Sequence, residues 1–261
     1  MVEGSLKQDY VDMNRVAYAV LVACLAAEAL LFVLDIFLNV AQFWYFEKFG
    51  QLSNVALEKS FGTWFSVVQN FAVALTALIL SIGYKSILGQ PKRSMGWFLV
   101  SAFFAYVSLD DDLMLHERVG GTVGPLLFGK GPGGAVPLPT YEWIFLFGPF
   151  FAAFGIFFLV FVWKELRDSR KRTIFVSGLF LWAVAQLLDA WEGTRSPYDW
   201  LLRSWGLKEM VVRHSFMLVE EVFEMLGSTF FLYLFLGHVG FLYSERRIVL
   251  GTPANRAMPG S

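Results

Sequence analysis

The residues best suited to chemistry lie in one short stretch, Ser108-Leu-Asp-Asp-Asp-Leu-Met-Leu-His-Glu117, which ends a long apolar run. The stretch brings together four carboxylates and one imidazole. An ionisable side chain inside a membrane helix costs at least about 2.5 to 3.5 kcal/mol, and it usually faces a partner, water or a bound cation. The stretch therefore indicates an acidic site within a membrane protein.

More carboxylates lie in or beside the other apolar runs. They include Glu28, Asp35, Asp110, Asp111, Asp112, Glu117, Asp189, Glu192, Glu220, Glu221 and Glu224. The only lysine or arginine inside these runs is Arg213. Negative charge in an apolar medium must be compensated, so these side chains are protonated, paired with arginines reaching in from the rim, or bound to metal ions.

Carboxylates on several helices together with one or two imidazoles are the ingredients of a metal site in a helical bundle. Such oxygen-rich ligation favours iron or manganese, and zinc is also compatible with His and carboxylate ligands. We therefore expect a mono- or dinuclear divalent metal ion. The expected metal ligands are Asp112, His116, Glu192, Glu221 and Glu224. The expected catalytic bases and proton carriers are Asp110, Glu117, Asp189 and Glu220, with Asp35 beside them.

Helical spacing supports this assignment. Asp112 and His116 are four residues apart, and Glu221 and Glu224 are three apart, so each pair shares one face of a helix. The other two histidines are expected to play smaller parts. His214 could be a second imidazole of the site or equally well a rim residue, and His238 is interpreted as a structural residue without acidic neighbours. Glu28 is interpreted as a protonated acid in the core.

Composition defines the elements that must position these residues. Of the 261 residues, 56% are hydrophobic and only 16% are charged, and the mean hydropathy is +0.55. These values predict an integral membrane protein. The formal net charge is -1 and no basic block accompanies exposed aromatic residues, so a nucleic-acid partner is not expected. The single cysteine, Cys24, cannot form an intrachain disulfide.

Six apolar runs are long enough to cross a bilayer, which needs about 20 helical residues. They are Val16–Tyr45, Thr63–Tyr84, Trp97–His116, Tyr141–Trp163, Ile174–Glu192 and Val211–Tyr243. The predicted fold is therefore all-α, a polytopic bundle of six transmembrane helices. Lysines and arginines gather after the second, fourth and sixth runs, which places both termini in the cytoplasm.

The predicted organisation has three parts: a cytoplasmic N-terminal segment over residues 1–15, the transmembrane domain over 16–245, and a disordered cytoplasmic tail over 246–261. Between the third and fourth runs, Val119–Thr140 is rich in glycine and proline. This density of helix breakers predicts a segment without regular structure. It could serve as a lid or as a plain connector.

Two motifs carry a resemblance. The stretch Ser108–Glu117 and the sequence Glu220-Glu-Val-Phe-Glu-Met-Leu-Gly227 resemble a pair found in uncharacterised multi-pass membrane proteins of bacteria and archaea. The resemblance covers only these stretches, and it implies topology but no activity. Asp112-x-x-x-His116 also resembles a copper-ligand pattern in the membrane subunit of particulate methane and ammonia monooxygenases, although the next histidine here is distant, at position 214. Ceramidase-like membrane hydrolases are similar in using few charged residues, but their closely spaced histidine pair is absent.

Three functions remain open. The leading hypothesis is a membrane metalloprotein, an enzyme of the hydrolase or oxidoreductase type, whose site near the outer face acts on a lipid-like or small hydrophobic substrate. The second is a proton- or cation-conducting transporter or channel. The third is a non-catalytic subunit of a larger membrane complex, or a homo-oligomer. In each case we expect the chain in a prokaryotic cytoplasmic membrane, in contact with lipid.

Overall fold

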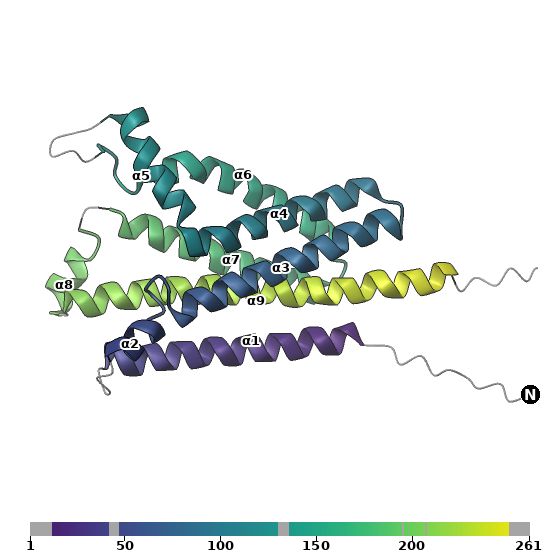
Figure 1. Ribbon diagram of the computed structural model, residues 1–261, viewed down its shortest axis with the longest axis horizontal. Coiled ribbons are helices and arrows are strands. Elements are labelled where there is room, and N and C mark those ends of the chain that lie inside the picture. The colour runs from purple at the N-terminus through teal and green to yellow at the C-terminus, as the bar shows by residue number, and fades with distance from the viewer. Residues whose placement is uncertain (1–11, 42–46, 130–135, 195, 207, 251–261) are drawn as a thin grey trace, which may run out of the picture.

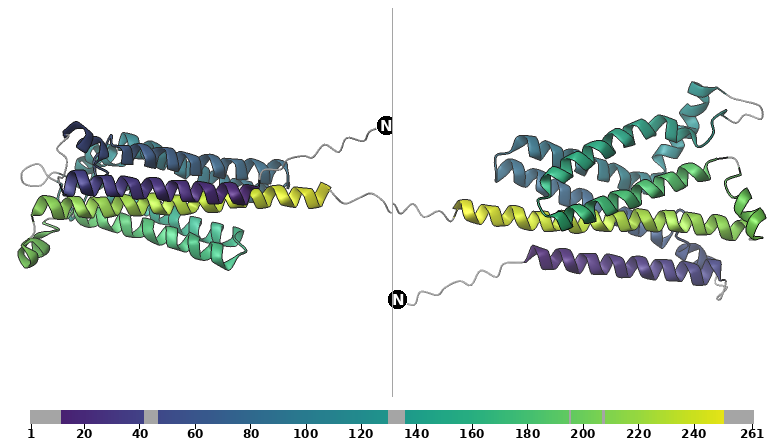
Figure 2. Two further views of the ribbon diagram at one scale, coloured as in Figure 1. Left: turned by 90° about the horizontal axis from the view of Figure 1, so that it is seen from below. Right: turned by 180° about the vertical axis from the view of Figure 1, so that it is seen from behind.

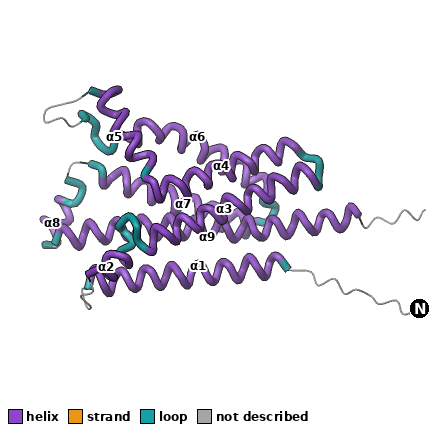
Figure 3. The backbone as a smooth tube through the Cα atoms, in the orientation of Figure 1, coloured by secondary structure: helices purple, strands orange, loops and turns teal. Residues whose placement is uncertain are grey.

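A computed structural model describes residues 12–41, 47–129, 136–194, 196–206 and 208–250 of the chain. Over these ranges the fold is entirely helical, without strands, as Figure 3 shows. The helices are α1 (Met13–Asp35), a π-helical turn η1 (Ile36–Val40), α2 (Glu47–Ser53), α3 (Phe61–Ser86), α4 (Pro91–Leu113), α5 (Leu115–Phe128), α6 (Glu142–Glu165), α7 (Ser169–Glu192), α8 (Asp199–Trp205) and α9 (Glu209–Leu250). The all-α prediction is confirmed.

Several helices begin at a local capping signal. The hydroxyl of Ser60 accepts a hydrogen bond from the Thr63 amide at 3.1 Å at the start of α3. The carboxylate of Asp168 accepts one from the Arg170 amide at 2.9 Å at the start of α7. Pro91 occupies the first position of α4, where its missing N–H is not needed. These side chains bind backbone donors that have no partner inside the helix.

The long helices α1, α3, α4, α6, α7 and α9 run along the bundle in alternating directions, and α5 and α8 lie at one end of it (Figure 1). We call this end the acidic end, because the carboxylates of α1, α4, α7 and α9 lie toward it. Helix α9 packs against α1, α3 and α7, and α3 packs along α4. Figure 2 shows α9 running between α1 and α7. The start of α1 and the end of α9 lie at the opposite end.

The core between these helices is largely aromatic. Trp97 of α4 meets Phe235 of α9 edge-on, with ring centroids 4.9 Å apart. Phe158 of α6 meets Phe231 of α9 in the same way at 5.1 Å. All four rings are at most 2% exposed. Aromatic pairs in this geometry add to the stability gained from burial alone, so they hold α4, α6 and α9 together.

Five helical segments are long and apolar enough to span a membrane: Met13–Val40, Phe61–Ser86, Glu142–Glu165, Ser169–Glu192 and Glu209–Leu242. Each coincides with a predicted run. The remaining predicted run lies in α4, which is not among the five. Its first turn contains Lys92 and Arg93 and its last turn contains Asp110, Asp111 and Asp112, so the apolar stretch between them is shorter.

The predicted boundaries near the two ends of the chain can be compared with the structure only in part. Residues 1–11, 42–45 and 251–261, which belong to the predicted N-terminal segment, first run and tail, lie outside the described residues. Within the described part, α1 already begins at Met13 and α9 continues to Leu250. The predicted boundaries at residues 15 and 246 therefore fall inside helices.

The prediction of an irregular segment over Val119–Thr140 is wrong for Val119–Phe128, which are helical in α5, whereas residues 136–140 are irregular. The glycines of α5 serve close packing. A Cβ on Gly120 would lie 2.8 Å from the Cβ of Trp143, and a Cβ on Gly124 would lie 2.7 Å from the Cβ of Glu142. Small residues at these positions let α5 approach α6 closely. The helix-breaking tendency of glycine is therefore outweighed by packing.

Candidate functional site

The break between α4 and α5 places an imidazole against a carboxylate. Helix α4 ends at Met114, whose φ of 49° lies in the left-handed region, and α5 starts at the next residue. The turn allows Oδ1 of Asp110 to accept a hydrogen bond from the His116 amide at 2.9 Å, while Oδ2 contacts Nδ1 of the same ring. Two residues expected to act separately, a base and a ligand, are thus bonded to each other.

The turn also separates Asp112 from His116. Spacing by four residues gives a shared face only within a continuous helix, and the helix is interrupted between them. Asp112 and Glu117 are both exposed, whereas Asp110 is buried. The expectation that Asp112 and His116 share a helix face is therefore wrong, and Asp110 takes the place of Asp112 beside the ring.

The electrostatics of His116 follow from this pairing. Burial lowers the pKa of the imidazole, but the hydrogen bond to Asp110 and the negative charges of Asp110, Glu117 and Asp189 outweigh it, so the pKa is raised above its ordinary value of 6.5. The edge of the Trp143 ring covers the other side, with ring centroids 4.5 Å apart. His116 is thus held in place as a partly shielded, readily protonated group.

Asp111 is the carboxylate that α4 directs into the bundle. Its Oδ2 accepts hydrogen bonds from the Ser66 hydroxyl at 2.8 Å and the Asn70 amide at 2.9 Å, both on α3. The carbonyl of Asn70 in turn accepts a hydrogen bond from Ser228 of α9 at 2.8 Å. Neutral donors therefore surround a carboxylate that was not among the predicted site residues. Serine and asparagine on an apolar run were the available signal.

Three glutamates of α9 interact electrostatically with Asp111 of α4 or Asp189 of α7, and Glu224 interacts with both. The strongest charged neighbours of Glu221 are Glu224, Asp111, Glu220 and Glu58, all of them carboxylates. Glu224 accepts a hydrogen bond from the Gln186 amide at 2.8 Å and interacts with Asp111 and Asp189. Glu220 interacts with Asp189 and Glu224. We refer to Asp111, Asp189, Glu220, Glu221 and Glu224 as the acidic group.

Glu192, a predicted metal ligand, has a cationic partner instead. Nε of Arg213 donates to its Oε1 at 3.0 Å, linking the end of α7 to the start of α9. Nearby, the negative charges of Glu192 and Asp189, together with burial as the largest cause, raise the pKa of Tyr141 to about 12. The structure therefore assigns Glu192 to a salt bridge at the rim of the acidic end.

His214 is more than a rim residue. Its Nε2 contacts Oδ1 of Asp35, and Oδ2 of Asp35 accepts a hydrogen bond from the Val55 amide at 2.6 Å. Asp35 is fully buried. The pair joins the end of α1, the segment before α3 and the start of α9. Sequence reasoning missed it because the two residues are 179 positions apart.

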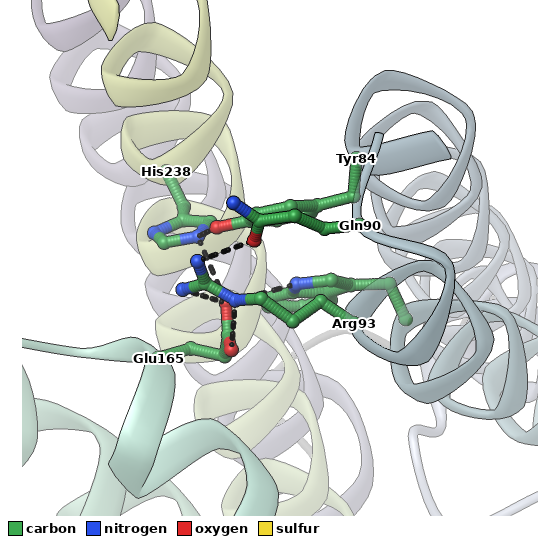
Figure 4. A network of polar contacts seen from close by, with 6 residues as sticks. Tyr84, Gln90, Arg93, Glu165 and His238 are labelled. Atoms are coloured by element: carbon green, nitrogen blue, oxygen red, sulfur yellow. Dashed lines mark hydrogen bonds and ion pairs between the residues drawn. The ribbon is translucent and has the colours of Figure 1, made fainter. Parts of the chain in front are cut away.

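A second polar network lies at the opposite end of the bundle (Figure 4). Arg93 of α4 donates from Nε and Nη2 to the two oxygens of Glu165 on α6, at 2.8 Å each. His238 of α9 lies 3.6 Å from Glu165 and 2.8 Å from the hydroxyl of Tyr84 on α3. The expectation that His238 lacks acidic neighbours is therefore wrong. These hydrogen bonds and ion pairs connect α3, α4, α6 and α9.

The described residues contain no group of three or more His, Cys, Asp and Glu side chains arranged to hold a metal ion. Of the predicted ligands, Glu221 and Glu224 lie close together, His116 interacts with Glu224 but is bonded to Asp110, Glu192 is bonded to Arg213, and Asp112 is exposed. The predicted five-residue ligand set is thus not assembled in this conformation.

Five apolar spans with polar networks between them indicate a multi-pass helical membrane protein whose outer surface contacts lipid. The chain belongs to the family described as Domain of unknown function (DUF8692), whose model matches residues 16–239. This agrees with the expected membership of an uncharacterised family, while the two motifs stay a prediction. Comparisons with curated proteins and with solved structures give no match.

Proposed function

We propose that this chain is a six-pass membrane transporter whose acidic group exchanges protons for cations with the side of the membrane at the acidic end. The observation that carries the proposal is the meeting of carboxylates from α4, α7 and α9 with neutral hydrogen-bond donors. Ser66, Asn70 and Gln186 supply those donors. Arg213, the only lysine or arginine within the predicted runs, is bonded to Glu192.

Electrostatics make such a group a binding site for positive ions. Two like charges 4 Å apart repel by about 4 kcal/mol at an effective dielectric constant of 20. The carboxylates therefore cannot all be ionised together without a compensating proton or cation. Because several share the site, binding a cation displaces protons from it.

An apolar layer separates this site from the opposite end. Nine residues of α9 lead from Thr229 to His238, a rise of roughly 13 Å. The side chains along this part of α9 include Phe231, Leu232, Leu234 and Phe235, all at most 5% exposed. This closed middle supports a transporter that must change conformation, in preference to an open channel.

The transport proposal is tested with purified protein in liposomes that enclose a pH-sensitive dye. Addition of a monovalent or divalent cation outside should drive proton movement, and Glu221→Gln combined with Glu224→Gln should reduce the rate at least about tenfold, since one lost binding interaction of 1.4 kcal/mol already gives that factor. The matched control is the exposed Asp112→Asn, which should keep the wild-type rate. Equal rates in all three proteins would overturn the proposal.

A second candidate is the metal-dependent enzyme, and the Asp110–His116 pair favours it. A carboxylate on Nδ1 is the usual way in which a metal-binding imidazole is oriented, leaving Nε2 toward the metal. Iron, manganese or zinc there, with His116 and nearby carboxylates, would polarise a lipid-like substrate. Stoichiometric metal in the purified protein that is lost in His116→Ala would support this function, and metal-free protein with full activity would remove it.

A further inference from the structure

Glu28 lies close to the middle of the span Met13–Val40, on a helix that contributes no member of the acidic group, and it is 3% exposed. We propose that Glu28 is a proton-binding site within the membrane, formed by α1, α3 and α9, and that it carries its proton in this conformation. The inference stands on its own contacts and does not require the acidic group to bind cations.

Two neighbouring helices supply hydrogen bonds to one oxygen of this carboxyl group. Oε1 of Glu28 accepts a hydrogen bond from the amide of Gln69 on α3 at 3.0 Å and from the hydroxyl of Thr229 on α9 at 2.6 Å. The same Gln69 amide also donates to Thr229 at 2.5 Å. One oxygen is therefore fully satisfied by two side chains that carry no charge.

The remaining oxygens lack donors. Among the described residues, Oε2 of Glu28 and Oε1 of Gln69 are buried acceptors without a hydrogen-bond partner. A buried polar atom in this state costs about 1–3 kcal/mol, so two on adjoining side chains require an explanation. A single proton on Oε2 supplies it. The protonated carboxyl group then has an O–H donor at Oε2, and Oε1 of Gln69 is a buried acceptor that this O–H can supply with a hydrogen bond.

Among the described residues, no positively charged side chain acts on Glu28. The side chains that face it are Gln69 from α3 and Thr229 from α9, both neutral. A titratable neighbour among the described residues is Cys24, one turn earlier on α1 and close to the same threonine and glutamine. An unpaired carboxylate at this depth is costly, whereas the neutral acid completes the hydrogen bonds already present.

The decisive measurement is the infrared spectrum of the carboxyl region, compared in H2O and D2O. Wild-type protein should show a C=O stretching band of a neutral acid that is missing from Glu28→Gln. Because glutamine has the shape of the protonated acid, Glu28→Gln should also keep the wild-type melting temperature. Glu221→Gln should retain the band, which separates this site from the acidic group.

A second variant tests the proposal even if Glu28→Gln does not fold. Gln69→Leu removes a donor to Oε1, so the acid band should move to higher frequency. Two results would overturn the proposal. One is an ionised Glu28, seen as an unchanged acid region in Glu28→Gln. The other is a melting temperature that is higher in sodium chloride than in choline chloride for the wild type but not for Glu28→Gln. That result would indicate that Oε2 of Glu28 and Oε1 of Gln69 bind a sodium ion.

Discussion

Several buried polar side chains of this protein are hydrogen-bonded to residues of other helices. Asp35 and His214 are 179 positions apart, and Glu28 and Thr229 are 201 positions apart. The sequence identifies such residues, because a polar side chain on an apolar run is conspicuous. It does not identify their partners, since helical periodicity relates only residues a few positions apart. Asp110 and His116 are only six positions apart, but the left-handed backbone of Met114 between them ends the helix, so helical spacing does not predict their contact.

The first prediction concerns His116. Its pKa is raised above 6.5 by Asp110, so the pair stabilises the fold fully below that pH, and the contribution is lost as pH rises through the raised pKa. Asp110→Asn should lower the pKa of His116, measured by NMR of the imidazole. It should lower the melting temperature most under acidic conditions. Asp112→Asn is the control, and an equal effect of both variants would contradict the assignment.

The second prediction concerns the ion pair between Arg93 and Glu165 at the opposite end. Glu165→Gln leaves the partly exposed guanidinium of Arg93 without its carboxylate, which should lower the free energy of unfolding by about 1–3 kcal/mol. A double-mutant cycle with Arg93→Met measures the coupling between the two side chains, because the double variant lacks both the guanidinium and the carboxylate. Strictly additive losses in reversible unfolding would show that the two side chains act independently.

Elements were predictable where their composition was uniform. Each of the five helical segments able to span a membrane coincides with a predicted apolar run, because length and hydropathy alone define a span. Helix α5 was not predicted, since its glycines serve contacts with Trp143 and Glu142 that the sequence does not reveal. Helix–helix contact in this protein therefore depends on small residues at particular positions.

The contact between α7 and α9 gives the third prediction. A Cβ on Gly227 would lie 2.3 Å from Trp182 and 2.9 Å from the carbonyl oxygen of Gly178. Gly227→Ala should therefore destabilise the protein by about 1–3 kcal/mol. Gly155→Ala in α6 is the matched control, because a Cβ added at Gly155 would have no atom within 4 Å. There the higher helix propensity of alanine should leave the melting temperature equal or higher.

The whole molecule is layered along its length. Carboxylates and two Asp–His pairs occupy the acidic end, aromatic and aliphatic side chains fill the next layer, and the Arg93–Glu165–His238 network closes the opposite end. Carboxylates at this end were predicted from the sequence, but the two Asp–His pairs were not. The Arg93–Glu165–His238 network was not predicted either, because its three residues lie far apart in the chain. Such layering is what the proposed transport function requires, since it places the acidic group toward one end of the bundle.

The central claim is that the acidic group holds protons that cations displace. The most direct measurement follows proton release when a cation is added to purified protein in unbuffered detergent solution with a pH indicator. Wild-type protein should release protons in proportion to the cation bound, and the variant with Glu221→Gln and Glu224→Gln should release few or none. Equal release by the two proteins, or cation binding without release, would contradict the account.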